Sequence, residues 1–134
     1  MHHINIPKDK RRSMADLHFD HVQWTNSLRF YKEEVGIFRN RLEEVVSKNT
    51  NWEFAAKAEH FQNSFILQNE QIDTLSHDIK IHENGMSAFA KEQPIAAEHG
   101  TFANHEGLEE RMESFVKLYQ ELKADFNRFL SEWM

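Results

Sequence analysis

Residues 54–82 read FAAKAEHFQNSFILQNEQIDTLSHDIKIH and contain neither proline nor glycine, the two residues that most often interrupt a helix. Apolar residues recur along this stretch at alternating steps of four and three, which is the spacing of one helix face. The row consists of Phe54, Ala58, Phe61, Phe65, Gln68, Ile72, Leu75, Ile79 and His82. It predicts a long helix that packs against neighbouring helices along one seam.

Two further stretches have the same spacing. The first row is Leu17, His21, Trp24, Leu28, Tyr31, Val35, Phe38, Leu42 and Val45. The second row is His105, Leu108, Met112, Phe115, Tyr119, Leu122, Phe126, Phe129 and Trp133. The capping patterns Ser13-x-x-Asp16 and Thr50-x-x-Glu53 mark helix starts, so we predict helices at about 14–48, 51–83 and 104–133.

The fold class predicted from these rows is all-α, an elongated antiparallel three-helix bundle with heptad-like seams. Asn84 and Gly85 are typical of a helix stop, and we expect residues 84–103, which contain Pro94, to form an irregular or short-helical linker. We expect residues 14–134 to form a single domain after a flexible N-terminal arm, residues 1–13. Because neighbouring ends are usually joined by short routes, we expect the third helix to run parallel to the first.

Composition limits the classes of function. The chain has 134 residues, a formal net charge of -6 and no cysteine. The negative charge argues against a nucleic-acid partner, and the absence of thiols excludes disulfides, thiolate metal sites and cysteine nucleophiles. No apolar run is long enough for a membrane span and no signal-peptide core is present, so we predict a cytoplasmic protein without a membrane partner.

No motif in the chain indicates a reaction. A Gly-rich phosphate loop following a strand is absent, and the serines lie on predicted helices or caps without the sharp turn that presents a nucleophile. The basic residues 8–12 are expected to form a solvated tail. Whether the protein is an enzyme therefore stays open at the level of sequence.

Three polar residues interrupt the middle of the seams. Tyr31, Gln68 and Tyr119 each hold the central position of their row. We expect them to share one layer, in which the Gln68 amide lies between two phenols and fixes the register of the helices. The alternative is that this layer contacts a ligand.

Histidines interrupt the seams at one end. The chain has nine His, and His21, His82 and His105 hold seam positions that meet at the same end if the third helix runs parallel to the first. Imidazoles and carboxylates that converge between helices form transition-metal sites. The candidate ligands are His18, His21, Asp78, His82, His105 and Glu109. We predict one or two transition metal ions (Zn, Fe, Mn or Ni); the alternatives are histidines tolerated at a solvated bundle end, or a pH-responsive cluster.

This construction resembles the hemerythrin-like proteins, which carry a di-iron site between the helices of a bundle. The resemblance rests on His18-x-x-His21, His77-x-x-x-x-His82 and His105-x-x-x-Glu109 and covers the bundle end only. The family pattern, a His followed by H-x-x-x-E, H-x-x-x-H and H-x-x-x-x-D on four helices, differs from these spacings. What the resemblance implies is a way of building a metal site between helices.

A second set of apolar residues lies off the seams. Phe30 and Ile37 on the first helix, with Ile66 and Leu67 on the second, predict a surface that pairs with a second copy in a homodimer. The alternative is cover by the linker, and its residues would be Phe89, Ile95 and Phe102. A structural or interaction bundle without metal is the second functional hypothesis.

Overall fold

The chain folds into three long helices. The computed structural model describes residues 13–92 and 94–133, with side chains at 13–87 and 104–133. The helices are α1 (Met14–Ser47), α2 (Trp52–Glu92) and α3 (Pro94–Trp133), and no strand occurs in the described ranges. The predicted all-α three-helix bundle is therefore confirmed.

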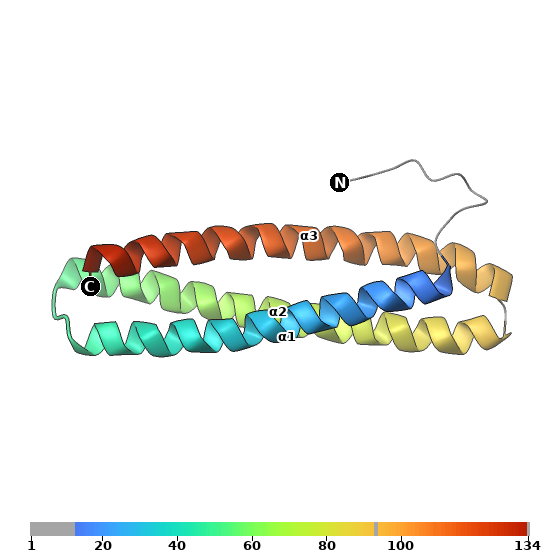
Figure 1. The fold of residues 1–134 in the computed structure, drawn as a ribbon, viewed down its shortest axis with the longest axis horizontal. Helices are drawn as coiled ribbons and strands as arrows, with labels where there is room; N and C mark the ends of the chain where they lie inside the picture. The colour runs from blue at the N-terminus through green and yellow to red at the C-terminus, as the bar shows by residue number, and fades with distance from the viewer. Residues whose placement is uncertain (1–12, 93, 134) are drawn as a thin grey trace.

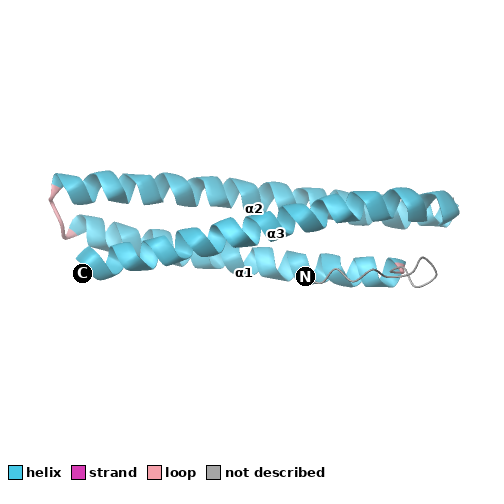
Figure 2. Ribbon diagram, turned by 90° about the horizontal axis from the view of Figure 1, so that it is seen from above, coloured by secondary structure: helices cyan, strands magenta, loops and turns pink. Residues whose placement is uncertain are grey.

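The three helices alternate in direction along one rod (Figure 1). α2 returns antiparallel to α1, and α3 returns antiparallel to α2, so α3 runs parallel to α1 as predicted. Figure 2, turned by 90°, shows the same extended shape. The start of α1, the end of α2 and the start of α3 consequently lie at one end of the rod.

The helix starts follow from capping hydrogen bonds. At α1, the Ser13 hydroxyl accepts from the Asp16 backbone N–H at 3.2 Å, and the Asp16 carboxylate accepts from the Ser13 N–H at 3.1 Å. This is the predicted capping box. At α2 the prediction is wrong by one residue, because the Asn51 side chain, rather than that of Thr50, accepts from the N–H groups of Glu53 and Phe54.

The segment 84–103 differs from the predicted linker, because it is divided between the two long helices. α2 continues through Asn84 and Gly85 to Glu92, and no described glycine has a positive φ, the conformation that ends a helix. Two residues after Asn84, Met86 is buried, which favours continuation of the helix. Pro94 occupies the first position of α3, where a missing N–H costs nothing.

Aromatic rings fill the core away from the histidine end. Phe126 lies 5.4 Å from Phe38, 5.4 Å from Phe61 and 4.9 Å from Phe65, measured between ring centroids. Rings also span the gap between α1 and α3, including Tyr31 and Tyr119 at 4.7 Å. α1 and α3 nevertheless approach each other less closely than either approaches α2.

The central polar layer has a different bonding pattern from the one predicted. The fully buried Tyr119 hydroxyl donates to Glu34 at 2.7 Å, and the same carboxylate accepts from Lys123 at 2.8 Å. Burial, followed by the bond to Glu34, raises the pKa of Tyr119. The buried carbonyl oxygen of Gln68 has no hydrogen-bond partner among the described atoms. Glu34, which lies off the seam, takes the role expected of Gln68.

Three further predictions concern a membrane span, the N-terminal arm and the cover of the off-seam residues. Within the described ranges, no helix combines the length and the apolar character that a bilayer crossing needs. Of the predicted N-terminal arm, only Ser13 lies inside the described residues. The side chains of Phe89, Ile95 and Phe102 lie outside them, so linker cover of the off-seam residues is not described.

The direction of α3 can be tested with spin labels on cysteines at the exposed positions Glu43 and Arg128, since the chain has no cysteine of its own. Tyr119 and Lys123 lie level with Glu34, so residues 43 and 128 lie level on adjacent helices. The expected label separation is about two helix diameters, or ~20 Å. A reversed α3 would place the labels on the order of 45 Å apart, at 1.5 Å per residue.

Candidate metal centre

Three histidines from three helices meet at one end of the rod. His21 lies in the second turn of α1, His82 lies ten residues before the end of α2, and His105 lies eleven residues after the start of α3. Their ring centroids are 5.1 Å apart for His21–His82 and His21–His105, and 6.1 Å apart for His82–His105. One ring nitrogen from each lies within 4.8 Å of the others. The parallel direction of α3 brings these residues together, as the sequence predicted.

The cluster is enclosed rather than spread over the surface. His21 and His105 are only 3% and 2% exposed, and His82 is half-buried. The indole of Trp24 stacks on His105 at 4.8 Å and contacts His21 at 5.6 Å. Histidines tolerated at a wet bundle end would be more exposed, so the burial disfavours that interpretation.

Two carboxylates hold the outer nitrogens of the buried rings. Nδ1 of His21 lies 2.6 Å from Oε1 of Glu83, and Nε2 of His105 lies 2.9 Å from Oδ2 of Asp20. An ionised carboxylate only accepts hydrogen bonds, so these ring nitrogens carry the protons. Each carboxylate bridges two helices, because Glu83 of α2 holds a ring of α1 and Asp20 of α1 holds a ring of α3.

The inner nitrogens are consequently turned toward one another. Nε2 of His21 lies 3.3 Å from Nδ1 of His105, and the buried Nε2 of His82 has no hydrogen-bond partner among the described atoms. When both buried rings are neutral and donate to their carboxylates, lone pairs face each other across this contact. Such a contact needs a cation between or on the rings, either an added proton or a metal ion.

The spacing of the inner nitrogens suits a tetrahedral metal. Two imidazole nitrogens bound to Zn²⁺ at about 2.05 Å with a tetrahedral angle lie ~3.3 Å apart. The His21–His105 contact already has this separation, at 3.3 Å. His82 offers a third ring nitrogen within 4.8 Å of the other two.

Electrostatics favour the neutral, ligating form of the third ring. Burial lowers the pKa of His82, and the neighbouring His21 and His105 lower it further, outweighing the opposite effect of Glu83. At Glu83, burial alone would raise the pKa, but the hydrogen bonds from His21 and His18 outweigh it and lower the pKa. The site therefore combines a neutral imidazole with an ionised carboxylate.

Three of the six predicted ligands lie outside the group of converging nitrogens. His18 is exposed, and its Nδ1 bonds the second oxygen of Glu83 at 2.9 Å. Asp78 accepts from Arg111 at 2.8 Å, on the flank between α2 and α3. Glu109 lies one turn along α3 from His105 but is not among the three residues whose ligand atoms converge.

Sequence reasoning missed Asp20 and Glu83. Each is adjacent in sequence to a seam histidine, Asp20 before His21 and Glu83 after His82. An adjacent residue lies about 100° around the helix, on the flank that faces the neighbouring helix. An acid beside a seam histidine was therefore the available signal.

The chain matches no protein-family model, no curated protein and no solved structure. The resemblance to hemerythrin-like proteins thus remains one of construction, and the site is interpreted from its own geometry.

The lowered pKa of His82 predicts an acid-sensitive fold in the absence of metal. The folded chain binds a proton at His82 less readily than the unfolded chain does. The stability that the neutral His82 ring contributes is therefore retained above the usual imidazole pKa of about 6.5 and is lost as pH falls below it. We expect chelator-treated protein to lose stability to urea between neutral pH and pH 5, and His82→Leu to lose less. The control His77→Gln, which removes an exposed histidine, should lose as much stability to urea between neutral pH and pH 5 as wild type does. An equal loss of stability in wild type and His82→Leu would contradict the prediction.

Proposed function

We propose that this chain binds one divalent transition metal ion through His21, His82 and His105. The observation that supports the proposal most strongly is the 3.3 Å contact between the inner nitrogens of His21 and His105, whose outer nitrogens bond carboxylates. A metal ion turns this contact between lone pairs into a pair of ligand bonds. It also supplies a partner for the buried Nε2 of His82.

The carboxylates act as outer partners that orient the ligands. A ligating histidine commonly donates its other ring N–H to a carboxylate, which fixes the tautomer and raises the basicity of the ring. Glu83 does this for His21 and Asp20 does it for His105. Their two negative charges balance the two positive charges of the ion, which lowers the cost of holding it among buried groups.

The donor set favours Zn²⁺ among the metals considered. Neutral imidazoles suit Zn, Fe and Ni, whereas Mn prefers carboxylates, and here the carboxylates are engaged outside the ring cluster. Square-planar Ni²⁺ needs four donors in one plane, which three helices around a central point do not supply. Three histidines leave a fourth position for water, as at zinc sites that remain open to exogenous ligands.

Metal content and stability test the proposal together. Untagged protein, stripped with chelator and titrated with zinc, is expected to bind one equivalent per chain and to melt at a higher temperature, because only the folded chain carries the site. The double variant His21→Leu, His105→Leu should bind none. Its metal-free form should melt above metal-free wild type, since two buried Leu replace two facing imidazoles.

The matched control removes two exposed histidines, through His60→Gln and His77→Gln. It should keep both the zinc stoichiometry and the zinc-dependent rise in melting temperature. Wild type that binds no metal in this titration, or a His21→Leu, His105→Leu variant that retains one equivalent, would contradict the proposal. In that case the cluster would be held by protons, and the chain would be a bundle without metal.

A further inference from the structure

The outward side of α1 carries three large apolar side chains. Phe19, Phe30 and Ile37 are 60%, 56% and 64% exposed. Eleven and seven residues separate them in turn, close to three and two helical turns, so they form one stripe on the side of α1 away from its core row. We call Phe19, Phe30 and Ile37 the α1 stripe.

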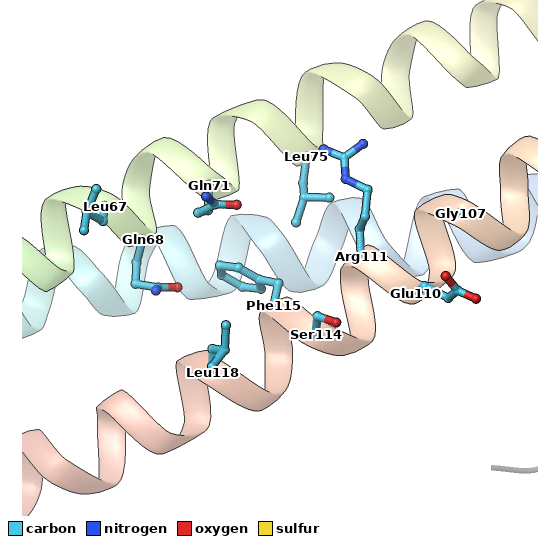
Figure 3. Close-up of a pocket in the computed structure, with 10 residues that line it drawn as sticks. All are labelled: Leu67, Gln68, Gln71, Leu75, Gly107, Glu110, Arg111, Ser114, Phe115 and Leu118. Carbon is cyan, nitrogen blue, oxygen red and sulfur yellow. The ribbon is translucent and has the colours of Figure 1, made fainter.

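The other predicted members of a dimer surface lie elsewhere. Ile66 and Leu67 are on α2, and as adjacent residues they point about 100° apart. Leu67 lines a groove of about 540 Å³ between α2 and α3, with Leu118 on the opposite wall (Figure 3). The off-seam residues therefore lie on separate faces of the bundle. Phe30 and Ile37 share the α1 stripe with Phe19, whereas Ile66 and Leu67 lie on α2.

Reversal of the helix pairs the two ends of the α1 stripe with each other. If a second α1 is laid antiparallel with residue 28 at the centre, residues face each other when their numbers add to 56. Phe19 then faces Ile37 of the other copy, Phe30 faces Asn26, and Gln23 faces Glu33. Every contact occurs twice, as in an interface with two-fold symmetry.

Charge distinguishes this arrangement from a parallel one. A parallel pair would place Glu33 against Glu33, and like charges that meet in this way are destabilising. The antiparallel pair brings Arg41 of each copy, which also pairs with Glu44 of its own helix at 3.5 Å, beside Asp16 in the first turn of the other. The Asp16 carboxylate caps α1 through one oxygen and leaves the second available.

We infer that the chain forms an antiparallel homodimer through the α1 stripe. The contact runs for about 27 Å along each helix, at 1.5 Å per residue between Phe19 and Ile37. Interfaces built on one helix from each copy lie at the low end of the size range, so the dimer dissociates on dilution. His21 faces the core rather than the stripe, so dimer formation and metal binding can be measured independently.

Sedimentation velocity across a wide concentration range tests the surface. Wild type is expected to shift from the mass of one 16.0 kDa chain toward twice that mass as concentration rises. The double variant Phe30→Lys, Ile37→Lys should remain a single chain with unchanged helical circular dichroism. The control Leu67→Lys, Leu118→Lys, which places the same charges in the groove, should dimerise as wild type does. Wild type that stays monomeric at every concentration, or dimers lost only in the groove variant, would overturn the inference.

Cross-linking tests the direction of the two helices. Two single-cysteine variants, Phe19→Cys and Ile37→Cys, are each oxidised alone and then as a mixture with a disulfide reagent. Because the natural chain has no cysteine, every cross-link reports these positions. The antiparallel dimer predicts cross-links in the mixture and not in either variant alone. Efficient cross-linking within each single variant would show a parallel pair and overturn the assignment.

Discussion

The arrangement at the histidine end depends on one contact, between Nε2 of His21 and Nδ1 of His105 at 3.3 Å. Asp20 and Glu83 bond the outer nitrogens of the same rings, so the inner nitrogens present lone pairs to each other when both rings are neutral. A buried contact of this kind is unfavourable without a cation. Aliphatic side chains at the same seam positions would contribute roughly 1.5 to 3 kcal/mol each through burial. The chain gives up that stabilisation at three converging positions. This loss is the physical reason for proposing that the histidine end binds a metal ion.

The rest of the bundle supplies the register on which this contact depends. The aromatic cluster around Phe126 ties α1, α2 and α3 together at the far end, through rings of Phe38, Phe61 and Phe65. In the middle, Glu34 of α1 bonds both Tyr119 and Lys123 of α3. These interactions set how α1 and α3 align along the rod. A slip of α3 by one turn, about 5.4 Å, would separate His105 from both His21 and Asp20.

Much of this arrangement could be predicted from sequence because it follows from periodicity. The seam rows gave the three helices, and the short route between α2 and α3 predicted the direction that gathers His21, His82 and His105. Local signals were less reliable: Asn84 and Gly85 do not end α2, since the buried Met86 rewards continuation. The carboxylates were missed for a different reason. Periodicity selects residues that face the core, whereas Asp20 and Glu83 lie on the flanks and act across helix boundaries. Asp78 has a suitable spacing from His82, yet a cation on α3, Arg111, takes it as a partner.

The central claim is that three imidazoles, rather than carboxylates, form the inner surface of a cation site. X-ray absorption at the zinc edge of metal-loaded protein tests it most directly, because the spectrum reports the atoms bound to the ion. The account predicts nitrogen and oxygen neighbours at about 2.0 to 2.1 Å, with the outer scattering of three imidazole rings. A first shell dominated by oxygen, without imidazole scattering, would contradict it.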